Sequence, residues 1–229
     1  GSEMCIRDSY YATGRSASLT IGTSAAVRQI TNTIYLNREK QNFCYYLKKE
    51  LLVNGAPSNN GGIILAWAAN HLAENPVTFY ELLPDLLKET AIGANGLRFY
   101  PFLNGERAPY WSNEIKGGFQ DLTLQHTRMD MMRSVIEGIL LNIRQLVELV
   151  AKKEALSVSG GFFQTPVLGQ LAADVFGTTC HYAQQNEPIF GLYYLLEQPN
   201  RMIDEDQETF FPDPLKSAAY KQLAQDYFI

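Results

Sequence analysis

The sequence predicts an α/β domain in which helices flank a mixed sheet. Short β-prone runs alternate with helical runs along the chain, a pattern typical of this class. The longest helical stretch, from about Arg128 to Lys153, carries apolar residues at three- and four-residue intervals without a break, so one of its faces is buried. With 229 residues, 46% hydrophobic and 19% charged, the chain has globular composition and can bury a core.

The first half of the chain contains β-rich segments followed by two helices. A strand–turn–strand is predicted where β-prone runs surround Gly22-Thr23-Ser24. Residues that tolerate tight turns fill Asn54–Gly62, which is therefore predicted to be a loop, and Pro84 is expected to bend or restart the second helix. The elements in order are a strand pair at Leu19–Arg28, β-rich segments at Ile34–Leu36 and Phe43–Leu47, and helices at Ile63–Glu74 and Val77–Ala91.

The second half begins with a predicted buried strand and ends with a helix. Thr127 and Asp130 form a near relative of a capping box before the long helix. Thr165 caps a helix whose first residue is Pro166. The elements in order are a strand at Leu97–Leu103, a polar and aromatic loop at Asn104–Lys116, an extended segment at Gly117–Leu124, the long helix, a strand at Leu156–Ser159, a helix ending near Gly177, a strand at Thr178–Ala183, a short helix at Gly191–Glu197 and a terminal helix at Pro212–Ile229.

Charge and motif content exclude several classes of protein. The formal charge of −5 and a pI near 5.3 argue against nucleic-acid binding by bulk positive charge, and no apolar stretch of about 18 residues is present to span a membrane. The cysteines and histidines show no metal-ligand or disulfide spacing, which favours a reducing, cytoplasmic location and no metal site. Residues 1–18 begin with Gly-Ser, which resembles a cloning remnant. They are predicted to be a non-native or linker segment ahead of a domain at 19–229.

Two glycine turns are candidate contacts for a phosphate group. Gly22 lets a phosphate approach the backbone, and the Thr23 hydroxyl can donate a hydrogen bond to it. Gly160-Gly161 lies between a strand and the start of a helix, where amide groups and the helix dipole favour an anion. Either turn taken alone is more often an ordinary tight turn. Neither the P-loop pattern nor GxGxxG occurs in the sequence.

The loop Asn104–Trp111, NGERAPYW, is a third candidate. Its charges, proline and two aromatic residues can form a site or a hinge. The alternative is a packed loop in which Glu106 pairs with Arg107. The residue types favour neither interpretation over the other.

Four segments together resemble the C-terminal domain of the FGGY carbohydrate kinases, and the resemblance runs from about Leu19 to the C-terminus. They are LTIGTSAAVR (Leu19–Arg28), FYPFLNGERAPYW (Phe99–Trp111), GGFQDLTLQHTRMDMMRSVIEG (Gly117–Gly138) and SVSGGFFQTPVLGQLAADVFG (Ser157–Gly177). Within the family the chain is most similar to gluconate kinases, and xylulose and glycerol kinases match less well. The distinguishing strings are FCYYL (Phe43–Leu47), APSNNGGIILAW (Ala56–Trp67) and LNGERAPYW (Leu103–Trp111).

The resemblance implies an actin-like, ribonuclease H-like fold. It also implies a two-domain enzyme that binds a sugar and Mg-ATP in the cleft between its domains, with this domain supplying most nucleotide contacts. The implied nucleotide-binding positions are Gly22 and Thr23 at the β- and γ-phosphates, Gly62 beside the nucleotide, Gly160 and Gly161 at the turn that approaches the α-phosphate and ribose, and Gln164 or Thr165 near the adenine.

Several departures from the family pattern bear on function. Ala66 replaces a glutamine that many relatives have, Asp121 stands where a glycine is usual, and Glu187–Tyr193 replaces a run of small residues. The family's catalytic aspartate and most sugar contacts lie upstream of this chain. No catalytic residue is therefore assigned, and the absent N-terminal domain is the expected partner. We also expect an exposed apolar face where that domain docks, with homodimerisation through it as an artefact of truncation.

Four functions are open, in order of preference. The first is the ATP-binding half of a gluconate kinase. The second is the corresponding half of a kinase for another sugar or polyol, such as xylulose or glycerol. The third is a non-catalytic module that binds nucleotide or only a partner, and an actin-like filament protein is a more distant fourth. Binding of Mg-ATP separates the third function from the first two.

Overall fold

The computed structural model describes residues 14–48, 50–151, 154–182 and 208–228. The strands of this part of the chain are β1 (Ala17–Ile21), β2 (Ala25–Thr31), β3 (Phe43–Lys48), β4 (Leu51–Ser58), β5 (Arg98–Tyr100), β6 (Gly118–Gln120), β7 (Leu156–Ser159), β8 (Cys180–Tyr182) and β9 (Glu208–Phe210). The helices are α2 (Gly62–Leu72), α3 (Phe79–Glu89), α4 (Arg128–Val150), α5 (Pro166–Phe176) and α7 (Pro214–Gln225), with 3₁₀ turns η1 (Ala94–Gly96) and η2 (Gly161–Gln164).

The large sheet has the order β3-β4-β2-β1-β7-β8-β9, and β5 and β6 form a small separate sheet. The large sheet is mixed because two kinds of connection meet in it. β1 and β2 form a tight antiparallel hairpin, and β4 and β3 extend the antiparallel part. β1, β7 and β8 run parallel, which requires a crossover connection, and α5 supplies the one between β7 and β8. The predicted α/β class with a mixed sheet is confirmed.

Helix α4 is the centre of the core. Its apolar stripe, which includes Ile136, Ile139 and Ile143, is fully buried, and the helix packs against α2, α5, β2 and β4. Its first turn carries a complete capping box. Thr127 Oγ1 accepts a hydrogen bond from the Asp130 amide at 3.2 Å, and Asp130 Oδ2 accepts one from the Thr127 amide at 2.8 Å. Among the described residues no helix is long and apolar enough to cross a bilayer.

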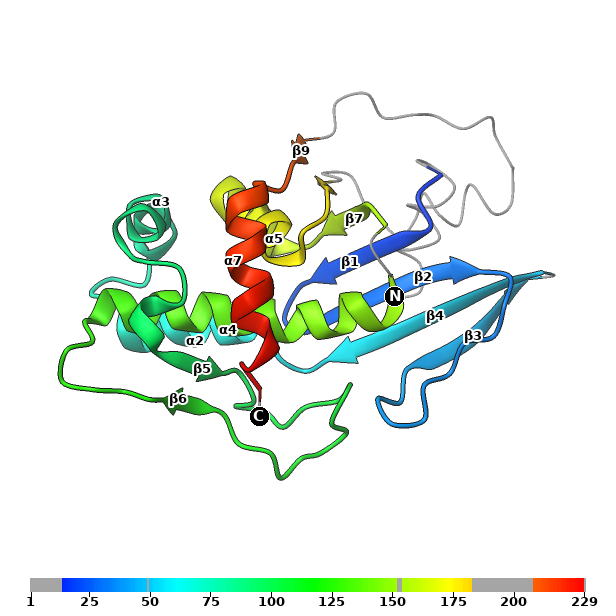
Figure 1. Cartoon of the computed structure of the whole chain (residues 1–229), viewed down its shortest axis with the longest axis horizontal. Coiled ribbons are helices and arrows are strands. Elements are labelled where there is room, and N and C mark those ends of the chain that lie inside the picture. The colour runs from blue at the N-terminus through cyan, green and yellow to red at the C-terminus, as the bar shows by residue number, and fades with distance from the viewer. Residues whose placement is uncertain (1–13, 49, 152–153, 183–207, 229) are drawn as a thin grey trace.

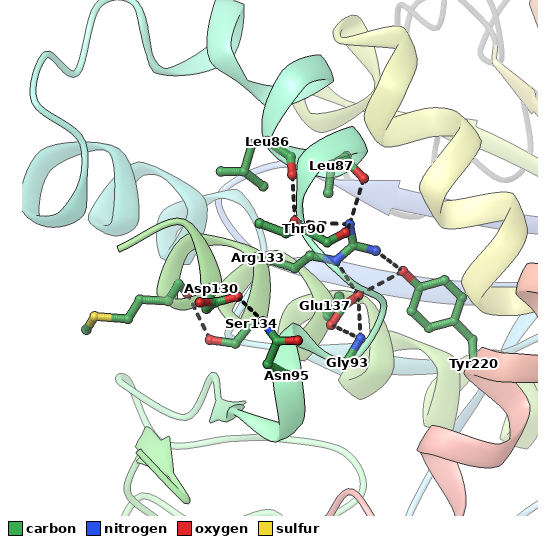
Figure 2. A network of polar contacts seen from close by, with 11 residues as sticks. Leu86, Leu87, Thr90, Gly93, Asn95, Asp130, Arg133, Ser134, Glu137 and Tyr220 are labelled. Carbon is green, nitrogen blue, oxygen red and sulfur yellow. Dashed lines mark hydrogen bonds and ion pairs between the residues drawn. The ribbon is translucent and has the colours of Figure 1, made fainter. Parts of the chain in front are cut away.

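The C-terminal helix α7 crosses α4 (Figure 1) and is tied to it by a buried polar cluster (Figure 2). Arg133 Nε donates to Glu137 Oε1 at 2.8 Å, and the Tyr220 hydroxyl, on α7, donates to the same oxygen at 2.8 Å. Arg133 also donates to the carbonyl oxygens of Leu87 and Thr90, at the end of α3. One buried ion pair therefore fixes three helices together.

Three predicted elements are wrong in the described residues. Asn54–Gly62 is not a loop, because β4 continues to Ser58 and pairs on both sides with β2 and β3. The ring of Phe43 covers Gly55, at 2.2 Å from where a Cβ would stand, so the glycine serves packing rather than a turn. The predicted strand at Leu97–Leu103 shrinks to β5, and Ile34–Leu36 forms no strand.

Other boundaries differ in smaller ways. α3 is a single helix that includes Pro84, so the expected restart does not occur. β1 begins at Ala17, inside the segment assigned to a linker, and β9 was not predicted. The expected short helix at Gly191–Glu197 and the unusual segment Glu187–Tyr193 lie outside the described residues.

Candidate functional site

A cavity of about 640 Å³ opens where four parts of the fold meet. The β1–β2 turn, the start of α2, the η2 turn with the start of α5, and one residue of α3 form its walls. The lining residues are Ile21, Gly22, Thr23, Gly62, Ile63, Leu65, Ala66, Tyr80, Gly161, Phe162, Gln164 and Thr165.

Six of the seven residues that the sequence assigned to nucleotide binding line this one cavity. They are Gly22, Thr23, Gly62, Gly161, Gln164 and Thr165. The seventh, Gly160, does not line it. Gly160 has a φ of 102°, and a Cβ on it would stand 2.2 Å from the Ile21 carbonyl oxygen. Its absent side chain therefore lets the η2 turn pack against the end of β1.

The β1–β2 turn and the start of α2 are joined by backbone hydrogen bonds. The Gly62 amide donates to the Gly22 carbonyl at 2.7 Å, and the Ile63 amide donates to the Thr23 carbonyl at 3.2 Å. A Cβ on Gly62 would stand 2.7 Å from the Gly22 oxygen, and one on Gly61 would stand 2.7 Å from the Ser24 carbonyl carbon. Glycine at these two positions therefore lets the two backbones meet and form one wall.

Gly161 and Gly22 face open space instead. No atom lies within 4 Å of a Cβ built on Gly161, and the nearest to one on Gly22 is the Ser24 oxygen at 4.0 Å. Packing within the described chain does not require glycine at either position. Because both residues line the cavity, their missing side chains leave room for a ligand that approaches the backbone.

The start of α5 adds a favourable position for an anion. Thr165 is the N-cap residue, its side chain makes no capping hydrogen bond, and Pro166 is the first residue of the helix. The positive end of the helix dipole therefore faces the cavity, with a free hydroxyl beside it. Leu65, Ala66, Phe162 and Tyr80 supply an apolar wall that suits a flat organic group.

Charged side chains are missing from the cavity wall. Among the described residues that line it there is no Asp, Glu, His, Lys or Arg, and the described part of the chain holds no cluster of three or more metal-ligating side chains. The cavity can hold a ligand by backbone groups, hydroxyls and apolar contacts. The described wall offers no carboxylate or imidazole to accept a proton from it.

Sequence reasoning missed part of the wall. Tyr80 is 41% exposed and reaches the cavity from α3, and Phe162 lies between the glycine pair and Gln164. The sequence did not indicate that Tyr80 would line the cavity, because only the folded chain brings α3 near the β1–β2 turn. Ala66 was noted as a departure from the family pattern, and it lines the cavity.

The NGERAPYW loop is packed rather than open. Glu106 is 1% exposed, and its carboxylate accepts the backbone amide of Arg107 at 2.8 Å. The packed-loop alternative is therefore the better description, but its side-chain pair between Glu106 and Arg107 is wrong, because the Arg107 guanidinium donates to the Ser58 carbonyl at 2.9 Å. The loop closes on the end of β4, next to the cavity wall.

Comparisons with known proteins agree with this geometry. The model of the FGGY family of carbohydrate kinases, C-terminal domain, matches residues 17–193. A gluconokinase from Bacillus licheniformis is 34% identical over 172 residues, which is 69% of this chain and 34% of the relative. The chain thus spans about a third of the length of this curated relative.

Solved structures of such kinases have the same fold over nearly all of this chain. A ligand-bound xylulose kinase from Lactobacillus acidophilus is 29% identical with a TM-score of 0.85, covering 98% of this chain and 48% of its own. A gluconate kinase from the same organism is 28% identical with a TM-score of 0.82, covering 98% of this chain and 51% of its own. The actin-like fold is confirmed. The chain therefore belongs to the FGGY family of carbohydrate kinases and matches its C-terminal domain.

Proposed function

We propose that this chain is the ATP-binding half of a gluconokinase-like sugar kinase. In the complete protein the γ-phosphoryl group of ATP is transferred to a hydroxyl of D-gluconate, giving 6-phosphogluconate. One observation carries the proposal: a single cavity brings together the Gly22-Thr23 turn, Gly62 and the Gly161–Thr165 segment. These segments lie far apart in the sequence, and chain packing leaves Gly22 and Gly161 open.

The proposed placement of ATP follows from the chemistry of the wall. Gly22 and Gly161 let phosphate oxygens approach the backbone, and the Thr23 hydroxyl donates to them. The adenine and ribose take the apolar side, where Tyr80 offers an exposed ring, and Gln164 offers an amide to the base. In this placement Gly160 does not touch the nucleotide. Its close contact with Ile21 holds the η2 turn against the end of β1.

In this proposal Mg²⁺ is bound by the phosphates of ATP and not by side chains of this chain. The cavity wall offers Mg²⁺ no carboxylate among the described residues, although this ion prefers carboxylate and phosphate oxygens. The described residues therefore do not form a metal site of their own. In our proposal the ion arrives bound to the nucleotide phosphates.

The same wall explains why a second half is needed. Phosphoryl transfer requires positioning, charge neutralisation and a group that accepts the proton of the attacking hydroxyl. The described cavity supplies positioning, and its lining contains no acidic or imidazole side chain. We assign the catalytic base and most sugar contacts to an N-terminal sugar-binding domain, and we expect this chain alone to be inactive as a kinase.

Another sugar is the leading alternative. The xylulose kinase and the gluconate kinase of Lactobacillus acidophilus match the fold of this chain about equally, with TM-scores of 0.85 and 0.82. The C-terminal half of such kinases carries few sugar contacts, so D-xylulose or glycerol remain candidates. A substrate screen of the full-length protein tests this, and preferred phosphorylation of D-xylulose over D-gluconate would overturn the gluconate assignment.

The proposal of nucleotide binding is tested by calorimetric titration of this chain with Mg-ATP. The matched variant is Gly161→Val, because a Cβ at this cavity-lining position would have no described protein atom within 4 Å other than those of its chain neighbours. Saturable binding that is lost in the variant supports the proposal. Absence of binding at millimolar Mg-ATP, in a wild-type chain shown to be folded by circular dichroism, contradicts nucleotide binding by this chain alone and favours a non-catalytic remnant.

A further inference from the structure

Glu106 places a negative charge inside the protein, next to the cavity wall. Its carboxylate is held by hydrogen-bond donors, and among the described residues no ion pair involves it. Oε2 accepts from Ser58 Oγ at 2.7 Å, Asn142 Nδ2 at 2.7 Å and Asn60 Nδ2 at 3.1 Å. Oε1 accepts from the backbone amides of Asn59 and Arg107, both at 2.8 Å.

The hydrogen-bond donors to Glu106 lie mainly on one short segment and on helix α4. Three belong to the consecutive residues Ser58, Asn59 and Asn60, the first of which is the last residue of β4. A fourth, Asn142, belongs to the buried helix α4 and is a rigid anchor. Asn60 is held twice more, because its Nδ2 also donates to the Gly105 carbonyl at 2.7 Å and its amide donates to Ser58 Oγ at 3.0 Å.

The segment held by Glu106 leads straight into the cavity wall. Gly61 and Gly62 follow Asn60, and a Cβ on either would already stand within 3 Å of the β1–β2 turn. The Gly62 amide bonds to the Gly22 carbonyl at 2.7 Å. With so little free space, a shift of Asn60 must move the glycine turn, and with it the start of α2 and Gly22.

We propose that Glu106 is a positioning residue for the nucleotide site. Its carboxylate fixes residues 58–60 against α4, so that Gly61-Gly62 stays pressed against the β1–β2 turn and the cavity keeps its shape. This role rests on the proposed nucleotide binding. The role also gives the NGERAPYW loop a function. The hydrogen-bond partners of Glu106 are not lining residues, so Glu106 acts on the cavity indirectly.

A second buried carboxylate provides the matched control. Glu137 is also 1% exposed, but it bonds to Arg133, Tyr220 and the Gly93 amide, none of which lines the cavity. Glu106→Gln and Glu137→Gln each turn one carboxylate oxygen into a donor that faces other donors. Both variants should lose stability, and only the first should disturb the cavity wall.

The experiment compares both variants with wild type well below their unfolding temperatures. Hydrogen exchange followed by NMR reports on the Gly62 and Ile63 amides, and calorimetry reports the Kd of Mg-ATP. Glu106→Gln should speed exchange of these two amides about tenfold and raise the Kd about tenfold, as expected for losing a hydrogen bond to a charged group. Glu137→Gln should leave both quantities as in wild type.

Two results would overturn the inference: wild-type exchange and Kd in Glu106→Gln, or equal losses in Glu137→Gln. If Glu106→Gln fails to fold, Ser58→Ala decides, since it removes only the hydroxyl between Glu106 and the Asn60 amide. Ser58→Ala should then show smaller changes in the same direction, and wild-type behaviour would overturn the inference. If wild type itself binds no Mg-ATP, the proposed function fails while amide exchange still decides whether Glu106 positions the turn.

Discussion

Gly160 and Gly161 are neighbours in the chain, but the structure requires glycine at only one of them. A side chain on Gly160 would collide with the Ile21 carbonyl and would hold a φ of 102°, which L-residues rarely adopt. A Cβ on Gly161 would have no described atom within 4 Å other than those of its chain neighbours, and the φ of Gly161 lies outside that region. Packing therefore explains the glycine at position 160, and the proposed nucleotide binding would explain the glycine at position 161.

We predict that alanine destabilises the fold strongly at Gly160 and hardly at all at Gly161. Gly160→Ala should lower the free energy of unfolding by about 3 kcal/mol, because strain and a backbone clash add. Gly161→Ala should change it by less than about 0.5 kcal/mol. Urea denaturation followed by circular dichroism measures both. Equal destabilisation by the two variants would show that Gly161 also serves packing.

Ala66 leaves a gap in the polar contacts of the cavity. It lines the wall from α2, at a position where many relatives carry glutamine, and its side chain offers no hydrogen bond. Ala66→Gln should tighten Mg-ATP binding about three- to tenfold, the effect of one added neutral hydrogen bond. Calorimetry measures the change, and Asn70→Gln, one turn further along α2 and outside the lining, is the control. An unchanged Kd would place the nucleotide away from α2.

Asp121 shows how a departure from the family pattern is accommodated by one residue. It has a φ of 63°, a left-handed conformation for which glycine is suited and which Asp tolerates better than most residues. Its carboxylate also pairs with Arg98 at 2.6 Å, across the small sheet. The sequence showed the replacement. The ion pair that goes with it depends on how β5 and β6 align, which no local pattern specifies.

The first turn of α4 depends on ionised Asp130. Desolvation acts to raise the pKa of Asp130, but hydrogen bonds from the Thr127 amide and hydroxyl and from Asn95, with the nearby His126, outweigh it and hold the pKa below its ordinary value. A carboxyl group with a lowered folded-state pKa stabilises the fold above its unfolded-state pKa. That stabilisation is lost as the pH falls below about 4.

Asp130→Asn should therefore flatten the acid limb of the stability profile. Wild type should lose more unfolding free energy than the variant as the pH falls from about 5 to about 2. Urea midpoints at several pH values measure the difference. Asp85→Asn, an exposed carboxylate on α3, should follow wild type. Parallel profiles for wild type and Asp130→Asn would show that the capping box does not depend on charge.

One hydroxyl joins α7 to the buried ion pair of α4. The Tyr220 hydroxyl accepts a hydrogen bond from Arg133 Nη2 at 2.9 Å and donates one to Glu137. Tyr220→Phe should cost about 1–3 kcal/mol of unfolding free energy, because it leaves a buried guanidinium donor without its acceptor. Thermal and urea unfolding measure this loss, with Tyr45→Phe on exposed β3 as the control. Equal stability of the two variants would show that the Tyr220 hydroxyl adds no net stability to the docking of α7.

Elements with strong local signals could be predicted, and elements defined by distant partners could not. The stripe and cap of α4 are local, so both were found in the sequence. β4 was predicted as a loop because NGAPS favours turns, whereas pairing with β2 and β3 imposes an extended backbone. Pro84 was expected to bend or restart a helix, and the helix does not restart there: Phe79, Leu83 and Leu86 are buried on both sides of the proline.

At the scale of the whole molecule, the cavity is made by topology. Parallel pairing of β1 with β7 brings Gly22 and Gly161 to one edge of the sheet. The hydrogen bonds of α2 bring Gly62 to the same place. The residues themselves made the two glycine turns candidates, although each alone was ambiguous, and only the resemblance to the FGGY family pointed to Gly62, Gln164 and Thr165. The contribution of Tyr80 requires the packing of α3, so it could not be predicted.

The described fold also leaves large apolar side chains in contact with solvent. Ile34 and Leu36, between β2 and β3, and Tyr46 on β3 are each more than half exposed. Apolar surface of this kind is typical of a face that binds another domain or chain. Docking of an N-terminal domain there, and homodimer formation through it in this chain, remain predictions.

The isolated chain is expected to lack kinase activity. Because the described cavity wall holds no proton acceptor such as Asp, Glu or His, this chain should show no gluconate-dependent turnover of ATP. A chimera should restore turnover if it joins this chain to the remaining part of the Bacillus licheniformis gluconokinase, because the chain matches only 34% of that protein. A coupled ADP assay measures turnover, and Gly161→Val in the same chimera should abolish it. Turnover by this chain alone would show that it contains a base outside the described cavity wall. A chimera that folds and binds Mg-ATP but shows no turnover would show that this half does not support phosphoryl transfer.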